Sequence, residues 1–196
     1  MRRGELKELH YITLITSVPS IMEHGILSHR RAKKVAHNSL AMPEIQDRRA
    51  KVMVPGGRPL HEYANLYVCA RNPMMYKRRG QHEEVCVLSV DADVLDVPGV
   101  VVTDANASGE YVRFAAAPSG LIIVDRELTF AAYWTDPNLI LYYQKKAAKC
   151  AEVLVPDRVE PKFTVGVYVS CDASLARMQE LDVNLQATVD PHLFFL

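Results

Sequence analysis

The sequence has none of the short motifs that mark the most common enzyme folds. It contains no GxGxxG turn for dinucleotides, no GxxxxGK[ST] loop for nucleotide phosphates, no HExxH zinc motif and no GxSxG nucleophile turn. These absences exclude the commonest nucleotide-binding folds, metalloproteases and serine hydrolases.

Metal-ligand and disulfide patterns are also lacking. His24, His29 and His37 are too loosely spaced to form a metal site, and the cysteines show no CxxC or mixed His/Cys spacing. We therefore expect no bound metal. We expect buried free thiols in a reducing compartment for Cys69, Cys86, Cys150 and Cys171.

No apolar run approaches the roughly 18 residues that a membrane-spanning helix needs. The first residues, MRRGELKEL, carry charge but no apolar core, which is not typical of a signal peptide or an anchor. We expect a cytoplasmic protein with no membrane partner. With 196 residues, 49% of them hydrophobic, the chain suits a single domain over 1–196.

The net charge is zero, but the charges are unevenly distributed. From His29 to Arg79 there are 12 Lys/Arg and 3 Asp/Glu, a balance of +9, and the remainder has a balance of −9. This asymmetry favours a face for a polyanion such as nucleic acid over an ordinary solvated face.

Strand and helix signals alternate irregularly, which favours an α+β fold. Asp136-Pro137 is a strong helix start and predicts a helix to about Lys149, and Asp172 is expected to cap a helix through Leu181. About six strands are predicted, at Leu9–Ile15, Asn65–Ala70, Val85–Val90, Val100–Thr103, Ala151–Val155 and Phe163–Ser170, with an added edge strand at His192–Leu196.

The basic residues cluster around an early loop. Residues 28–60 have weak periodicity and are punctuated by Gly56-Gly57, and a long segment of this kind is usually functional or mobile. Arg48 and Arg49 precede an apolar run, so one of them is expected to point inward. Further on, RNPMMYKRRG interleaves positive charge with an aromatic ring. This composition suits phosphate contacts and base stacking, although an ordinary enzyme loop can have it too. The residues concerned are Arg71, Tyr76, Lys77, Arg78 and Arg79.

One carboxylate interrupts an apolar run near the end of the chain. Lys145–Pro156 passes from a basic helix into Ala151–Val155, and Glu152 lies inside that strand. It either points to solvent from a strand edge or is aimed into a cleft. If it is unpaired, its removal is expected to leave the fold intact.

A late carboxylate, early arginines and a polar first strand suit one kind of chemistry. An arginine can grip a pyrophosphate, while a carboxylate meets a ribose hydroxyl and the positive charge of an oxocarbenium-like centre.

Five segments, in order, resemble the DarT family of DNA ADP-ribosyltransferase toxins over nearly the whole chain. They are YIT…PSIMEHGIL (11–27), IQDRRAKVMVPGG (45–57), LHEYANLYVCARNPMMY (60–76), VTDANAS (102–108) and KCAEVLVPD (149–157). The resemblance implies an ADP-ribosyltransferase fold, with mixed or antiparallel sheets and short helices around an NAD cleft, and NAD consumed as a substrate.

The resemblance also implies roles for individual residues. Glu152 corresponds to the catalytic glutamate, and Arg49, favoured over Arg48, to an arginine that acts in catalysis. NAD contacts are implied for the first strand, for the other arginine and for the aromatic ring of NPMMY: His10, Tyr11, Thr13, Arg48 and Tyr76. Contacts to single-stranded DNA are predicted for Arg71, Lys77, Arg78, Arg79 and Asn106.

Two departures bear on the modified base. Many relatives have ITH where this chain has Ile12-Thr13-Leu14, and FTDGHA where it has VTDANA, so Asn106 replaces a histidine. Branches of the family modify thymine or guanine, and these changes favour guanine here. The resemblance implies a toxin whose partner is a macrodomain-type antitoxin hydrolase that strips ADP-ribose from DNA.

Other functions fit parts of the pattern. An RNA 2′-phosphotransferase-like enzyme shares the fold and uses NAD, but it relies on basic side chains and does not need Glu152. A protein-directed ADP-ribosyltransferase is a second enzymatic alternative. A nucleic-acid-binding module without catalysis is the third, and it would have little reason to keep a carboxylate in an apolar strand.

Overall fold

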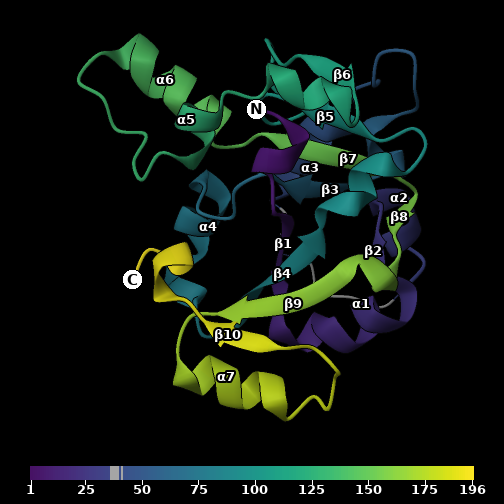
Figure 1. The fold of residues 1–196 in the computed structure, drawn as a ribbon, viewed down its shortest axis with the longest axis vertical. Helices are drawn as coiled ribbons and strands as arrows, with labels where there is room; N and C mark the ends of the chain where they lie inside the picture. The colour runs from purple at the N-terminus through teal and green to yellow at the C-terminus, as the bar shows by residue number, and fades with distance from the viewer. Residues whose placement is uncertain (36–39, 41) are drawn as a thin grey trace.

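A sheet of eight strands runs through the computed structural model, which describes residues 1–35, 40 and 42–196 (Figure 1). The strand order is β10-β9-β4-β1-β3-β7-β5-β6, and neighbouring strands are antiparallel except the parallel pair β9 and β10. The strands are β1 (Glu8–Leu14), β3 (Tyr63–Tyr67), β4 (Val85–Asp91), β5 (Val101–Thr103), β6 (Phe114–Ala116), β7 (Glu152–Pro156), β9 (Thr164–Val169) and β10 (Ala187–Val189). A separate antiparallel pair joins β2 (Ile26–Leu27) to β8 (Arg158–Val159).

Short helices surround the sheet. Figure 1 shows α7 beside β10 at one edge, and α5 and α6 extending outward near the other end of the sheet. The α-helices are α1 (Val18–His24), α2 (His29–Ala32), α3 (Pro43–Arg49), α4 (Pro73–Arg78), α5 (Arg126–Phe130), α6 (Leu139–Ala148) and α7 (Asp172–Gln179). Single 3₁₀ turns lie at Arg3–Glu5, Ile15–Ser17, Leu60–Glu62, Arg79–Gln81, Ala92–Asp96, Ser119–Ile123, Pro161–Phe163 and Pro191–Phe194.

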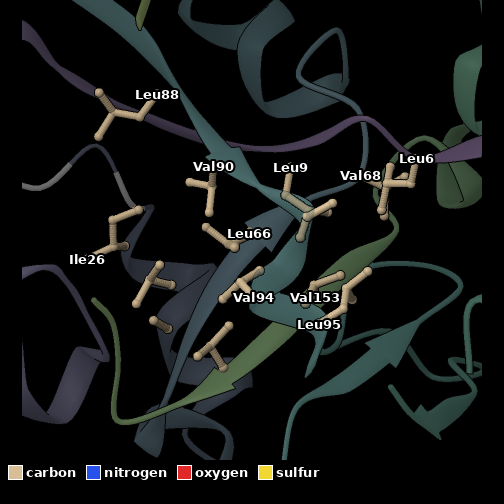
Figure 2. Close-up of a cluster of buried hydrophobic side chains, with 14 of the residues drawn as sticks. Leu6, Leu9, Ile26, Leu66, Val68, Leu88, Val90, Val94, Leu95 and Val153 are labelled. Atoms are coloured by element: carbon tan, nitrogen blue, oxygen red, sulfur yellow. The ribbon is translucent and has the colours of Figure 1, made fainter. Parts of the chain in front are cut away.

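The main hydrophobic core lies on one face of the sheet. Side chains alternate between the two faces of a strand, so β1, β3, β4 and β7 each send every second residue into this cluster. Figure 2 shows Leu9, Leu66, Leu88 and Val153 gathered there, and each is fully buried. Burial of one such side chain contributes about 1.5–3 kcal/mol. This packing fixes the strand register, and with it the side chains on the opposite face.

The centre of the sheet contains a narrow joint. Strand β1 pairs with β4 along its whole length, from Glu8↔Asp91 to Leu14↔Val85. Its pairing with β3 on the other side consists of the single register pair His10↔Tyr67. The sheet therefore consists of two half-sheets, β10-β9-β4-β1 and β3-β7-β5-β6, which are joined by this one register pair.

The α+β prediction is confirmed, with more strands than the six expected and with different ends for some elements. Helix α6 begins after Asn138, whose side chain accepts from Ile140 N at 2.9 Å and Leu141 N at 3.3 Å. The predicted start at Asp136-Pro137 is wrong, because Asp136 instead accepts from Lys145 Nζ at 2.7 Å. Helix α7 has Asp172 as its first residue and not as its cap.

Three stretches that were expected to be irregular or extended have a different structure. The basic segment contains α2 and α3, and the NPMMY segment forms α4, because Asn72 caps it by accepting from Met74 N and Met75 N. The predicted edge strand His192–Leu196 is wrong. Pro191–Phe194 is a 3₁₀ turn that buries Phe194, and β10 forms the edge.

Candidate active site

The first residue of β7 meets the last residue of α3 in a buried ion pair. Arg49 Nη1 donates to Glu152 Oε2 at 3.0 Å and to Oε1 at 3.2 Å. Glu152 is 0% exposed and Arg49 is 5% exposed, whereas Arg48 is exposed. The expectation that one of the two arginines points inward is therefore confirmed, and that residue is Arg49.

A second side chain holds the same carboxylate. Asn106 Nδ2 donates to Glu152 Oε1 at 3.0 Å, and Asn106 Oδ1 accepts from Ser108 N at 3.0 Å and Ser108 Oγ at 2.6 Å. On the adjacent strand, Thr103 Oγ1 accepts from Glu152 N at 3.2 Å. The structure thus brings Asn106, expected on the DNA surface, to the candidate catalytic carboxylate, where it fixes the carboxylate's orientation.

Opposing effects act on the ionisation of Glu152. Burial raises the pKa of its carboxyl group, while the charge and hydrogen bonds of Arg49 and a backbone hydrogen bond from Ala107 oppose the rise. The expectation that Glu152 is unpaired is wrong, so the prediction that its removal leaves the fold intact loses its premise. Removing it would leave the Arg49 guanidinium buried without its partner.

Tyr67 lies directly across from Glu152 and was not among the residues singled out from the sequence. The two are register partners between β3 and β7, and Tyr67 is also the one partner of His10 across the joint. Burial raises the pKa of the Tyr67 hydroxyl, and the negative charge of Glu152 raises it further. The alternation of Tyr63, Asn65 and Tyr67 along the strand could have indicated that these side chains share one face. The sequence does not identify the strand that pairs with them, so it does not show that Tyr67 lies opposite Glu152.

The predicted first-strand residues do not share one environment. His10 Nε2 lies 3.3 Å from Oε1 of Glu8, two residues earlier on β1. Tyr11 packs against the main core, and burial raises its pKa. Thr13 is buried two residues further along. NAD binding by His10, Tyr11, Thr13 and the exposed Arg48 stays a prediction.

Glu8 is the centre of a hydrogen-bonded network beside the joint. Its carboxylate accepts from Tyr168 Oη at 2.9 Å and from Ser89 Oγ, and it contacts His10. Burial alone would raise the pKa of Glu8, but the hydrogen bonds from His10, Ser89 and Tyr168 outweigh it and lower this pKa to about 2.

Replacing Glu8 with glutamine is expected to weaken the fold at neutral pH and to flatten its acid dependence. The folded-state pKa is below the ordinary value of 4.5, so the contribution of Glu8 is fully present above pH 4.5 and is lost as the pH falls towards about 2. We expect a loss of about 1–2 kcal/mol at pH 7, discounted for partial exposure, and convergence with the wild type near pH 2. Urea unfolding at several pH values measures this. Equal pH slopes for Glu8→Gln and the wild type would contradict it, and exposed Glu110→Gln is the control.

Apart from Asn106, the predicted DNA-binding residues lie around α4 in a basic and aromatic cluster that includes Tyr76, whose expected contact with NAD stays a prediction. The Arg79 guanidinium lies 4.0 Å from the centre of the Tyr76 ring, which packs edge-on against Trp134 and Phe195. Two of the arginines also hold backbone carbonyls: Arg71 donates to His192 O and Arg78 to Leu40 O. Lys77 is exposed, and its Nζ makes a long contact to Met42 Sδ at 3.7 Å.

Neither a metal-binding cluster nor a membrane-spanning helix is found among the described residues. Over residues 1–35, 40 and 42–196, no three side chains of His, Cys, Asp or Glu are grouped so that they could hold a metal ion. In the same described ranges, no helix has the length and apolar character needed to cross a membrane. His37 and part of the basic segment 28–60 lie outside the described residues.

Comparison of the sequence with known families gives one match over most of the chain. The model of the family described as "ssDNA thymidine ADP-ribosyltransferase, DarT" matches residues 10–195. A DNA ADP-ribosyl transferase–DNA ADP-ribosyl glycohydrolase fusion protein of Thermosipho africanus is 30% identical over 97% of this chain. The chain spans 50% of the length of that fusion protein. A DNA ADP-ribosyl transferase of Thermus sp. is 31% identical over 75% of this chain and 73% of its own length.

Solved structures show the same fold. Thermosipho africanus DarTG in complex with ADP-ribose superposes with a TM-score of 0.84 at 27% identity, over 97% of this chain and 51% of that one. Thermus sp. 2.9 DarT in complex with ADP-ribosylated single-stranded DNA gives a TM-score of 0.82 at 23% identity, over 99% of both chains. The same Thermus protein in complex with NAD⁺ gives 0.78 at 22% identity, over 97% of this chain and 98% of that one.

Proposed function

Because this chain belongs to the DarT family, we propose that residues 1–196 act as one domain that transfers ADP-ribose from NAD to a base of single-stranded DNA. The observation that carries the proposal is the buried pair of Arg49 and Glu152, with Asn106 on the same carboxylate. A catalytic carboxylate needs a fixed position and a tuned environment, and this arrangement supplies both.

The chemistry follows from what these side chains can do. Glu152 can accept a hydrogen bond from a ribose hydroxyl and stabilise the positive charge that develops on the ribose when the bond to nicotinamide breaks. Arg49 can bind phosphate oxygens through the same guanidinium that now holds the carboxylate. Glu152 or Arg49 can then assist removal of the proton from the attacking base nitrogen. Asn106 keeps Glu152 in place during these steps.

We place the DNA along the basic cluster around α4. Exposed Lys77 and the ring of Tyr76, with Arg79 above it, offer a phosphate contact and a stacking surface next to each other. Arg71 and Arg78 have a second role, because their hydrogen bonds to His192 O and Leu40 O tie α4 to other parts of the chain.

Two residues of this chain bear on which base is modified. The sequence favours guanine, on the grounds of Leu14 and Asn106, whereas the family description names thymidine. Asn106 contacts the catalytic carboxylate directly, so the exchange of histidine for asparagine lies within reach of the reacting base.

We also propose that the enzyme is the toxin of a toxin–antitoxin pair and acts in the cytoplasm. A bulky adduct on a base edge blocks pairing, so free activity would damage the host. The fusion of a related transferase to a DNA ADP-ribosyl glycohydrolase in Thermosipho africanus supports a macrodomain-type hydrolase as the partner.

The test is a product analysis. The purified protein is incubated with NAD and one acceptor at a time. The acceptors are single-stranded oligonucleotides that contain only one reactive base, matched RNA and a protein lysate. We expect one added ADP-ribose on DNA alone, on guanine oligonucleotides in preference to thymine ones. Labelling of RNA or protein, with DNA unchanged, would overturn the proposed function, and labelling of thymine alone would overturn the choice of base.

A further inference from the structure

A lysine for which the described residues supply no carboxylate partner is buried close to the site. Lys149, at the end of α6, is 1% exposed. Its Nζ donates to Ala131 O at 2.8 Å and to Cys69 Sγ at 3.4 Å. Burial lowers the pKa of this lysine, and the charge of Cys69 opposes the change. A buried ammonium is costly unless it meets a negative group, and in the described part of the chain the group within reach is the Cys69 thiol.

A second thiol lies across from Cys69. The register pair Tyr67↔Glu152 is followed by Val68 and Ala151, joined by a backbone hydrogen bond of 3.0 Å from Val68 N to Ala151 O. Cys69 and Cys150 are the next residues on the two segments, just beyond the ladder, which ends at Tyr67↔Glu152. Cys150 lies in the turn that follows α6, where its N donates to Ala147 O at 2.9 Å. A disulfide needs Cα atoms about 4.4–6.8 Å apart, so residues that flank a cross-strand hydrogen bond are candidates for one.

Electrostatics supports the closeness of the two thiols. Burial raises the pKa of Cys150 to about 12, with further increases from Glu152 and from Cys69. Both cysteines are free in this structure. Each lies two residues along the chain from a residue of the site, Cys69 from Tyr67 and Cys150 from Glu152. A covalent link between them would therefore act on the ends of the two strands that position the catalytic carboxylate.

We propose that Cys69 and Cys150, with Lys149 beside them, are a reversible thiol pair whose oxidation by a peroxide closes a disulfide and switches the enzyme off. Lys149 Nζ lies 3.4 Å from Cys69 Sγ and is therefore placed to donate a hydrogen bond to this sulfur while a peroxide reacts with it. The covalent chemistry depends only on these three residues, whereas the loss of activity rests on the proposed function.

The oxidation proceeds in two balanced steps. The Cys69 thiolate attacks one peroxide oxygen, the O–O bond breaks, and hydroxide leaves, giving a sulfenic acid. The Cys150 sulfur then attacks the Cys69 sulfur. The S–S bond forms, the S–O bond breaks, and the departing hydroxide takes the Cys150 proton to become water. Overall two thiols and one hydrogen peroxide give one disulfide and two waters.

The test treats the purified protein with hydrogen peroxide and then with dithiothreitol. Non-reducing peptide mass analysis is expected to find Cys69 joined to Cys150, and transfer to DNA is expected to fall by about tenfold to a hundredfold, since small displacements of catalytic groups have effects of this size. Dithiothreitol should cleave the disulfide and restore transfer to DNA. It does not reverse methionine oxidation, so recovery would assign the loss of activity to the thiols. Cys171→Ser is the matched control, because Cys171 is partly exposed and its hydrogen bonds to Ser174 and Ser170 lower its thiol pKa. This variant should still be switched.

The variants Cys69→Ser and Cys150→Ser should keep the same activity before and after peroxide, and Lys149→Gln should slow formation of the disulfide. Circular dichroism confirms that each variant is folded. A peroxide-treated protein in which Cys69 stays free, or in which the disulfide forms without loss of activity, overturns the proposal. If the reduced protein transfers nothing to DNA, the proposed function fails, while a mapped Cys69–Cys150 bond still upholds the thiol pair.

Discussion

Replacing Glu152 with glutamine is expected to lower ADP-ribose transfer by about a thousandfold while the protein stays folded. Glutamine keeps the shape of the side chain, and its one amide oxygen can still accept from Arg49 and Asn106, so the packing around it is retained. The buried guanidinium loses its counter-charge, so we expect a folded protein of lower stability. It has no negative charge to offer a developing cation, and loss of one preorganised electrostatic partner in a buried site has effects of this order.

The measurement is the single-turnover rate of transfer to an oligonucleotide, with thermal unfolding of the same samples. Glu160→Gln, which changes a carboxylate paired with exposed Arg158, is the control and should keep full activity. A Glu152→Gln variant with a near wild-type rate would remove Glu152 from the chemistry. Glu152→Ala is less suitable, since it would leave Arg49 buried and unmatched.

Replacing Arg49 with methionine is expected to destabilise the fold by about 3–5 kcal/mol and to abolish transfer. The substitution leaves the Glu152 carboxylate fully buried without its counter-charge, which costs far more than loss of an exposed pair. The double variant Arg49→Met/Glu152→Gln should regain most of the stability but none of the activity. Such recovery would identify the buried charge as the cause.

The stability loss of Arg49→Met has a definite pH dependence. Burial already raises the pKa of Glu152, and removal of the arginine takes away the opposing effect. A folded-state pKa above the unfolded value of 4.5 means that the fold holds its proton more tightly, so destabilisation grows as the pH rises above 4.5 and fades below it. Chemical unfolding at pH 4 and pH 8 tests this. The control is Arg48→Met, because Arg48 is the exposed neighbour of Arg49. This variant should change the free energy of unfolding by less than about 0.5 kcal/mol. Equal losses for the two arginines would contradict the assignment.

The residues that carry the site were predictable where a local pattern singled them out. Glu152 stands out as a charge inside an apolar strand, and Arg49 as one of two arginines before an apolar run. Their contact was not visible in either pattern, since it depends on α3 ending over the first residue of β7. The same holds for Asn106, whose loop reaches the carboxylate only after β5 has paired with β7.

Local signals also competed with one another. Asp136-Pro137 and Asn138 both favour a helix start, and Lys145 decides between them by holding Asp136. The closing residues of the chain resemble a strand in composition. Burial of Phe194 against Met75 and Ile12 instead requires a turn there. Lys145 lies nine residues beyond Asp136, and the partners of Phe194 are much further away in the sequence. The residues next to each signal therefore do not decide between the alternatives.

The single register pair between β1 and β3 divides the backbone hydrogen bonds of the sheet into two nearly separate sets. His10 and Glu8 belong to one half, and Tyr67 and Glu152 to the other. Parting at this line would break few backbone hydrogen bonds, but it would expose the core shared by Leu9 and Leu88 of one half and Leu66 and Val153 of the other. Apolar packing is therefore what holds the two halves together. A molecule that contacts both halves at once binds only the joined form, and mass action then raises the free energy of parting with its concentration. Such a substrate would act as a clamp, and the catalytic groups would be held most rigidly when the substrate is in place.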